Sequence, residues 1–171
     1  MPSKVSGPTG GPAIYHDELM GSERETSGLD QERLLADWRW LCPQRVTLIE
    51  HSAFGDLFLR DDAGKVFLLN VSVGRLSLIA ETQPEFITQL EDDAKREEWL
   101  GESDSLAFAE RGLIPGPDQC IGFSVPLVFA ESDAHRTPYI ANIYDCVGCL
   151  GDIHRQIANL PDRAKVELVV E

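Results

Sequence analysis

The sequence lacks any long hydrophobic run, and its 171 residues include only 15 lysines and arginines against 29 aspartates and glutamates. No stretch approaches the roughly 18 consecutive apolar residues that a membrane-spanning helix needs. The shortage of basic side chains argues against binding to nucleic acid or to an anionic membrane surface, because both depend on clustered lysine and arginine. The formal net charge of −14 fits a protein whose partner is basic. We therefore expect neither a nucleic-acid partner nor a membrane partner.

Cysteine is scarce as well, at four residues, and a chain of this length can bury an adequate core without disulfides. The start of the chain has no apolar segment of the kind that a secretory signal needs, so we expect a cytoplasmic protein with reduced thiols. There is no Gly-x-Ser-x-Gly motif, no Walker phosphate-binding loop and no glycine-rich dinucleotide fingerprint. The four histidines share no spacing typical of metal ligands. We expect no enzymatic activity, no catalytic residue and no cofactor.

The sequence has the pattern of one ordinary domain with a tail. Residues 1–28 are rich in glycine, proline, serine and charge, which predicts a flexible N-terminal arm. Residues 29–171 are predicted to form a single compact α+β domain. Short apolar segments separated by turn residues predict an antiparallel β-meander of three or four strands, at 46–50, 56–60, 65–70 and 76–80.

Several helices are predicted to pack on this sheet. They cover 29–43, the region 84–112 in two pieces, and 146–160. Shorter strands are predicted at 120–130, at 138–144 and in the tail 165–171. Neighbouring residues of the meander are apolar on both faces, so we expect the sheet to be covered on both sides. We expect these side chains to be buried against the last helix: Phe54, Leu57, Leu59, Phe67 and Leu69.

The segment YDCVGCLGDIHRQI, residues 144–157, contains a Cys-x-x-Cys motif followed by a histidine. With Asp145 as the helix N-cap, Cys146 and Cys149 share one helical face with apolar residues, which predicts two buried core thiols. A helix N-terminus favours a thiolate, so a redox role stays open, and so does a metal site. The residues available for that alternative are Cys120, Cys146, Cys149 and His154.

An acidic block lies between residues 85 and 104, where eight carboxylates stand against two basic side chains, a local net charge of −6. Asp93 and Glu97 are four residues apart, a spacing at which like charges repel on a helix. Such a block is either a solvated helix face or a surface on which a basic partner relieves the repulsion. The candidate partner-binding residues are Glu91, Asp92, Asp93, Glu97, Glu98, Glu102 and Asp104.

Three short motifs follow one another in a specific order. They are Ala53-Phe54-Gly55-Asp56, then Gly122-Phe123 with Pro126, then Leu150-Gly151 with His154 and Gln156-Ile157. In this order and spacing the chain resembles the C-terminal domain family of type VI secretion system immunity proteins, a former domain of unknown function that often follows a GAD-like domain. Where the family usually has Gly-Gly, this chain has Phe129-Ala130-Glu131. The resemblance implies a non-enzymatic protein that binds and neutralises a cognate protein toxin, often a nuclease. It leaves the contact surface and the oligomeric state open.

Overall fold

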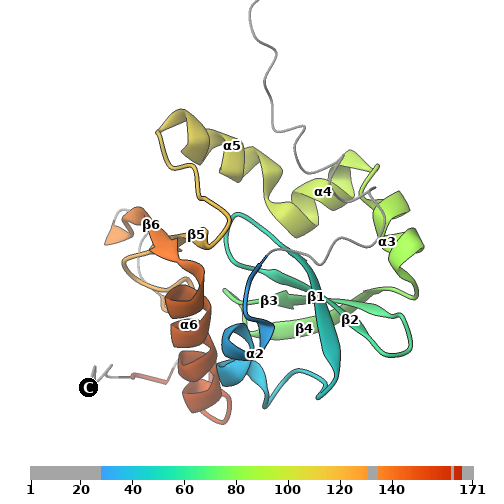
Figure 1. The fold of residues 1–171 in the computed structure, drawn as a ribbon. Coiled ribbons are helices and arrows are strands. Elements are labelled where there is room, and N and C mark those ends of the chain that lie inside the picture. Colours follow the sequence, from blue (N-terminus) through green and yellow to red (C-terminus); the bar gives the residue numbers. More distant parts are fainter. Residues whose placement is uncertain (1–27, 131–134, 163, 167–171) are drawn as a thin grey trace, which may run out of the picture.

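A four-stranded antiparallel meander forms the centre of the protein, with the strands in chain order across the sheet (Figure 1). The strands are β1 (Val46–His51), β2 (Leu57–Asp61), β3 (Val66–Asn70) and β4 (Arg75–Ala80). The computed structural model describes residues 28–130, 135–162 and 164–166. The predicted meander is confirmed. Residues 1–27 of the predicted arm and 167–171 of the predicted tail strand lie outside the described residues.

The turn between β2 and β3 follows from its own sequence. Asp61 Oδ1 accepts hydrogen bonds from the backbone N–H groups of Ala63 and Lys65, each at 2.9 Å. Gly64 has a φ of 89°, a conformation that glycine adopts without the steric cost of a Cβ atom. The side chain of Asp61 thus closes the predicted hairpin, and the register pairs Leu57 with Leu69.

Both faces of the meander are covered, as predicted. Leu57 and Leu59 lie in one fully buried cluster with residues of the C-terminal helix, while Phe58 points the opposite way into a second cluster. This follows from the period of two in a strand, which sends neighbouring side chains to opposite faces. Phe54 and Phe67 are only half-buried, so the expected burial against the last helix holds fully for the leucines alone.

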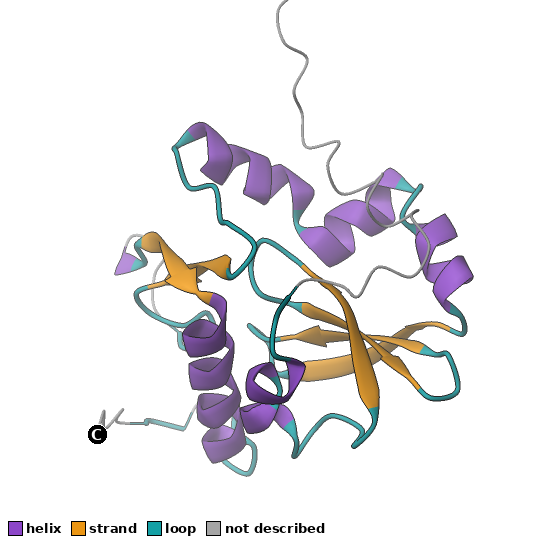
Figure 2. Cartoon of the chain, in the orientation of Figure 1, coloured by secondary structure: helices purple, strands orange, loops and turns teal. Residues whose placement is uncertain are grey.

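Three consecutive short helices follow the meander, α3 (Gln83–Gln89), α4 (Asp93–Leu100) and α5 (Glu102–Glu110) (Figure 2), and residues of α3 and α4 cover the second cluster. The sequence predicted two helical pieces here. The additional break arises because Asp92 caps α4 by accepting hydrogen bonds from two backbone N–H groups of its first turn. Gly101 then ends α4 with a φ of 60°.

The first cluster is covered by β5 (Gln119–Phe123), β6 (Pro138–Asn142) and α6 (Ile143–Ile157) (Figure 1). Helix α6 begins three residues earlier than predicted, because the side chain of Asn142, not that of Asp145, accepts the capping hydrogen bonds. Its buried residues are Ile143, Val147, Gly151, Ile153 and His154.

The predicted N-terminal helix is much shorter than expected. It consists of α2 (Gln31–Leu34) followed by a 3₁₀ turn, η1 (Ala36–Trp38). The tighter turn directs the Trp38 indole N–H to the backbone carbonyl of Val147, at 2.9 Å, which ties this segment to α6. Among the described residues, no helix has the length and apolar character required to cross a membrane.

Candidate functional site

The seven predicted partner-binding carboxylates lie together on α4, on the turn before it and on the first turn of α5. We call Glu91, Asp92, Asp93, Glu97, Glu98, Glu102 and Asp104 the acidic surface. All of these residues are exposed except Glu102, which is half-buried. The structure therefore brings the predicted residues onto one accessible pair of consecutive helices.

The expected repulsion within the acidic surface is relieved from inside the protein. Arg96 forms ion pairs with Asp93 and, at 3.1 Å, with Glu102. Glu97 accepts hydrogen bonds from the backbone N–H of Ser103, at 2.9 Å, and from its hydroxyl, at 2.8 Å. These bonds lower the pKa of Glu97. The repulsion expected between Asp93 and Glu97 is therefore offset within the protein, because each carboxylate has a partner of its own.

The acidic surface nevertheless keeps a large negative excess. Its two basic neighbours are already engaged, since Lys95 pairs with Glu98 at 3.0 Å and Arg96 with the two carboxylates named above. The side chains of Glu91 and Asp104 make no ion pair or hydrogen bond with any residue that the structure describes. Seven carboxylates against two cations leave a field that a basic partner can complement.

A stack of aromatic rings holds the acidic surface on the sheet. Phe58 of β2 contacts Phe86 of α3 with 5.2 Å between ring centroids, and Phe86 stacks on Trp99 of α4 at 5.8 Å. The Lys95 ammonium lies 5.1 Å from the centre of the Trp99 ring. Because Trp99 and Phe86 are buried, α4 has a fixed position and its outer carboxylates are preorganised.

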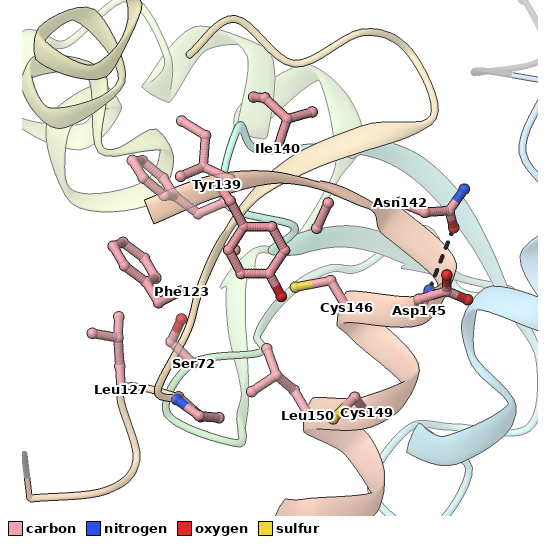
Figure 3. A pocket seen from close by; sticks show the side chains of 15 residues that line it. Ser72, Phe123, Leu127, Tyr139, Ile140, Asn142, Asp145, Cys146, Cys149 and Leu150 are labelled. Atoms are coloured by element: carbon pink, nitrogen blue, oxygen red, sulfur yellow. Dashed lines mark hydrogen bonds between the residues drawn. The ribbon is translucent and has the colours of Figure 1, made fainter. Parts of the chain in front are cut away.

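A pocket of about 360 Å³ opens between β5, β6 and α6 (Figure 3). Its walls include Phe123, Leu127, Tyr139 and Leu150, and its lining also contains Cys146 and Cys149. Tyr139 and Leu127 are 48% and 44% exposed, so the pocket is open to solvent and largely apolar.

The thiols are less uniform than predicted. Cys120 is fully buried, Cys146 is half-buried and Cys149 is exposed. The prediction of two buried thiols in the motif is wrong, because the buried face of α6 is centred on Val147 and Gly151 and leaves the cysteines at its margin.

Neighbouring groups shift the pKa values of these thiols in different directions. A hydrogen bond with Cys120 lowers the pKa of Cys146, and the same bond, followed by burial, raises the pKa of Cys120. Burial, and then the charges of Cys146 and nearby carboxylates, raises the pKa of Cys149. The half-buried Cys146 is therefore the thiol of this group that most readily becomes a thiolate.

His154 does not belong to the thiol group. Its ring packs against Trp38, with 5.7 Å between centroids, and covers Gly74 so closely that a Cβ there would be 2.4 Å from Nδ1. It is 5% exposed, and its Nε2 has no hydrogen-bond partner among the described residues. Burial lowers the pKa of His154, against the opposing effect of the Ser72 and Val71 backbone.

The metal alternative therefore has no assembled ligand set. The described part of the chain contains no group of three or more His, Cys, Asp or Glu residues placed to hold a metal ion. Cys120 belongs to the buried cluster against which Cys146 packs, whereas His154 serves the packing of α6 against the N-terminal segment.

Sequence reasoning missed the pocket, whose wall residues come from distant segments. Phe108 of α5 contacts Phe54 and Phe123 edge-on, at 6.0 and 6.1 Å between centroids, and so joins α5 to the pocket wall. The only signal in the sequence was an aromatic residue, Tyr139, in a short strand beside Pro138.

Comparison with family models finds no match, and comparison with curated proteins finds no significant match.

Proposed function

We propose that this protein is a non-enzymatic immunity protein that binds a basic, nuclease-type protein toxin through the acidic surface and thereby neutralises it. The observation that carries the proposal is the placement of seven carboxylates on α4, on the turn before it and on the first turn of α5, where Lys95 and Arg96 are already paired internally. A nuclease binds phosphates through clustered lysine and arginine. An acidic surface is complementary to such a groove and can occupy it.

The fixed position of α4 supports the same proposal. An interface on a preorganised element loses less conformational freedom on binding than one on a loose loop. Trp99, stacked on Phe86, anchors α4 on the sheet, while the exposed Glu91 precedes α4 and the exposed Asp104 lies in the first turn of α5. The carboxylates of α4 are thus carried by a helix that is anchored to the sheet.

The resemblance to the immunity family adds support of a different kind. Two of its glycines lie in close contacts that involve α6. A Cβ on Gly55 would touch Val147 at 3.3 Å and Cys120 Sγ at 3.4 Å, and one on Gly151 would lie 2.9 Å from Trp38 Nε1. These residues maintain the fold, so the resemblance supports a shared architecture. The acidic surface lies on the outside of the helices that cover the other face of the sheet, and it is free to differ between proteins that meet different toxins.

The test uses the product of the neighbouring gene, which for an immunity protein is expected to be the toxin. That product is expressed alone and together with this protein, and cell growth is measured. We expect growth to be arrested by the neighbour alone and restored by co-expression. A neighbour that is not toxic, or toxicity that co-expression does not relieve, would contradict the immunity function.

The variants for this test avoid residues with structural duties. Glu91, Glu98 and Asp104 are exposed and cap no helix, so a triple lysine reversal leaves the hydrogen bonds of Asp92 and Glu97 in place. The matched control reverses the same number of exposed carboxylates elsewhere: Asp62, Asp118 and Asp162. Both variants change the net charge equally, and only the first should lose protection. Equal loss in both would mean that net charge matters and the acidic surface does not.

A further inference from the structure

The pocket between β5, β6 and α6 has the dimensions of a binding site (Figure 3). Its volume of about 360 Å³ lies within the range of about 300–1,000 Å³ that is usual for ligand pockets. Two of its lining residues, Ile121 and Ala141, are buried on paired strands, so part of the lining is rigid. We propose that the pocket is a second contact with the basic protein toxin and takes up one or two apolar side chains of that toxin. This inference rests on the proposed function and deepens it.

The exposed side chains of the pocket wall are of the kind that anchor protein partners. Leu127 and Tyr139 are both large and exposed. The Tyr139 ring lies across the neighbouring strand, because its partner in the register is Gly122, where a Cβ would be 3.2 Å from Tyr139 Cζ. The Tyr139 hydroxyl makes no hydrogen bond with any residue that the structure describes. An aromatic ring beside an apolar pocket, with a hydroxyl available to a partner, is typical of an interface hot spot.

The charge of the pocket lining suits the same partner as the acidic surface. The lining contains one carboxylate, Asp145, and no lysine, arginine or histidine. A basic protein therefore meets no repelling charge when its apolar side chains enter the pocket, whereas an acidic protein is disfavoured by Asp145 and by the net charge of −14. The electrostatic complementarity proposed for the acidic surface thus extends to the pocket.

Helix α5 joins the pocket to the acidic surface. Its first turn carries Glu102 and Asp104 of the acidic surface. Further along the same helix, Phe108 contacts Phe54 and Phe123 of the pocket lining. Asp104 and Phe108 are separated by about 6 Å along the helix axis. An interface that buries about 800 Å² on each partner is roughly 30 Å across, so one bound protein can cover both places.

The two contacts should act on different rate constants. The charges of the acidic surface speed the encounter with a basic protein, and salt screens this effect. The apolar contacts in the pocket form only after the encounter, so they slow the dissociation of the complex. Burial of apolar side chains does not depend on charge, and salt therefore does not screen it. The pocket should control the dissociation rate at low and at high salt alike.

The test measures the binding kinetics of the neighbouring gene's product by surface plasmon resonance, with the double variant Leu127→Gln and Tyr139→Ser as the pocket variant. The matched control, Leu78→Gln and Val73→Ser, replaces two exposed apolar residues outside the pocket lining. Neither variant changes the net charge, and circular dichroism checks that both are folded. We expect the pocket variant to dissociate about tenfold or more faster at both salt concentrations, with an association rate within about twofold of the wild type. The control should behave as the wild type.

The outcomes separate this inference from the proposed function. A pocket variant that dissociates at the wild-type rate would overturn the inference and leave the acidic surface as the proposed contact. A control that dissociates as fast as the pocket variant would also overturn it, because the effect would not belong to the pocket. If the wild type does not bind the neighbouring gene's product at all, the proposed function fails, and this inference fails with it. If the double variant does not fold, Leu127→Gln alone decides the question in the same way, because that position is exposed.

Discussion

Two glycines of α6 provide a matched pair of substitutions, and we expect them to change stability in opposite directions. At Gly148, a new Cβ would meet only Asp37 Oδ2, at 3.2 Å. At Gly151, it would lie 2.8 Å from the Asp37 backbone oxygen and 2.9 Å from Trp38 Nε1. The first neighbour is the end of an exposed side chain that can swing aside, whereas the second set is backbone and a buried ring.

The magnitudes follow from three terms. Replacing glycine by alanine inside a helix stabilises it by about 1 kcal/mol. Gly148→Ala should retain most of this gain, roughly 0.5–1 kcal/mol. At Gly151, overpacking costs about 1–3 kcal/mol, and displacing Trp38 strains its hydrogen bond to Val147, which is worth about 1 kcal/mol. We therefore expect Gly151→Ala to destabilise the protein by about 1–3 kcal/mol net.

Urea unfolding followed by circular dichroism measures both variants against the wild type. The midpoint should rise for Gly148→Ala and fall for Gly151→Ala, with unchanged denaturant slopes, because neither substitution alters the surface exposed on unfolding. A stabilised Gly151→Ala would refute the close contact between α6 and the N-terminal segment. A strongly destabilised Gly148→Ala would show that Asp37 cannot move.

Two pH-dependence predictions follow from buried titratable groups. Burial lowers the pKa of His154 in the folded protein, so the unfolded chain binds the proton more readily. The contribution of neutral His154 to folding stability, which is fully present above about pH 6.5, should therefore be lost as the pH falls through the folded pKa. The stability of the wild type relative to His154→Gln should therefore fall as the pH is lowered below about 6.5, and a constant difference would contradict this. Asp56 should behave oppositely, because burial raises its pKa to about 6 against the hydrogen bonds from Val71 and Ser52. The stability of the wild type relative to Asp56→Asn should be greatest below about pH 4 and should fall by up to about 3 kcal/mol as the pH rises through about 6. A stability difference that grows with pH would show that the carboxylate is well solvated.

The meander could be predicted because its information is local. The period-two pattern and the Asp61–Gly64 turn specify strands and hairpin without help from distant residues. The start of α6 could not be predicted in the same way. Asn142 and Asp145 are both good caps, and propensity does not choose between them. The difference is that Ile143 is fully buried in the core and forms the first residue of the helix, which leaves Asn142 as the cap.

The acidic surface could be predicted from the sequence, whereas the pocket could not. Charge is visible in the sequence, so the exposed carboxylates of α4 could be named in advance. Their partners could not, because Ser103 reaches Glu97 only after Gly101 turns the chain from α4 into α5. The pocket was not predictable, because Tyr139 and Leu150 meet there only once β6 and α6 pack on the sheet.

The association rate between this protein and the neighbouring gene's product tests the acidic surface most directly. Binding is followed at low and at high salt for the wild type, for the Glu91, Glu98 and Asp104 lysine reversal, and for the control reversal at other sites. We expect the first reversal to slow association by about tenfold or more at low salt and by much less at high salt, and the control to be far less affected. Equal rates for the wild type and the acidic-surface reversal at both salt concentrations would contradict the proposed role of this surface.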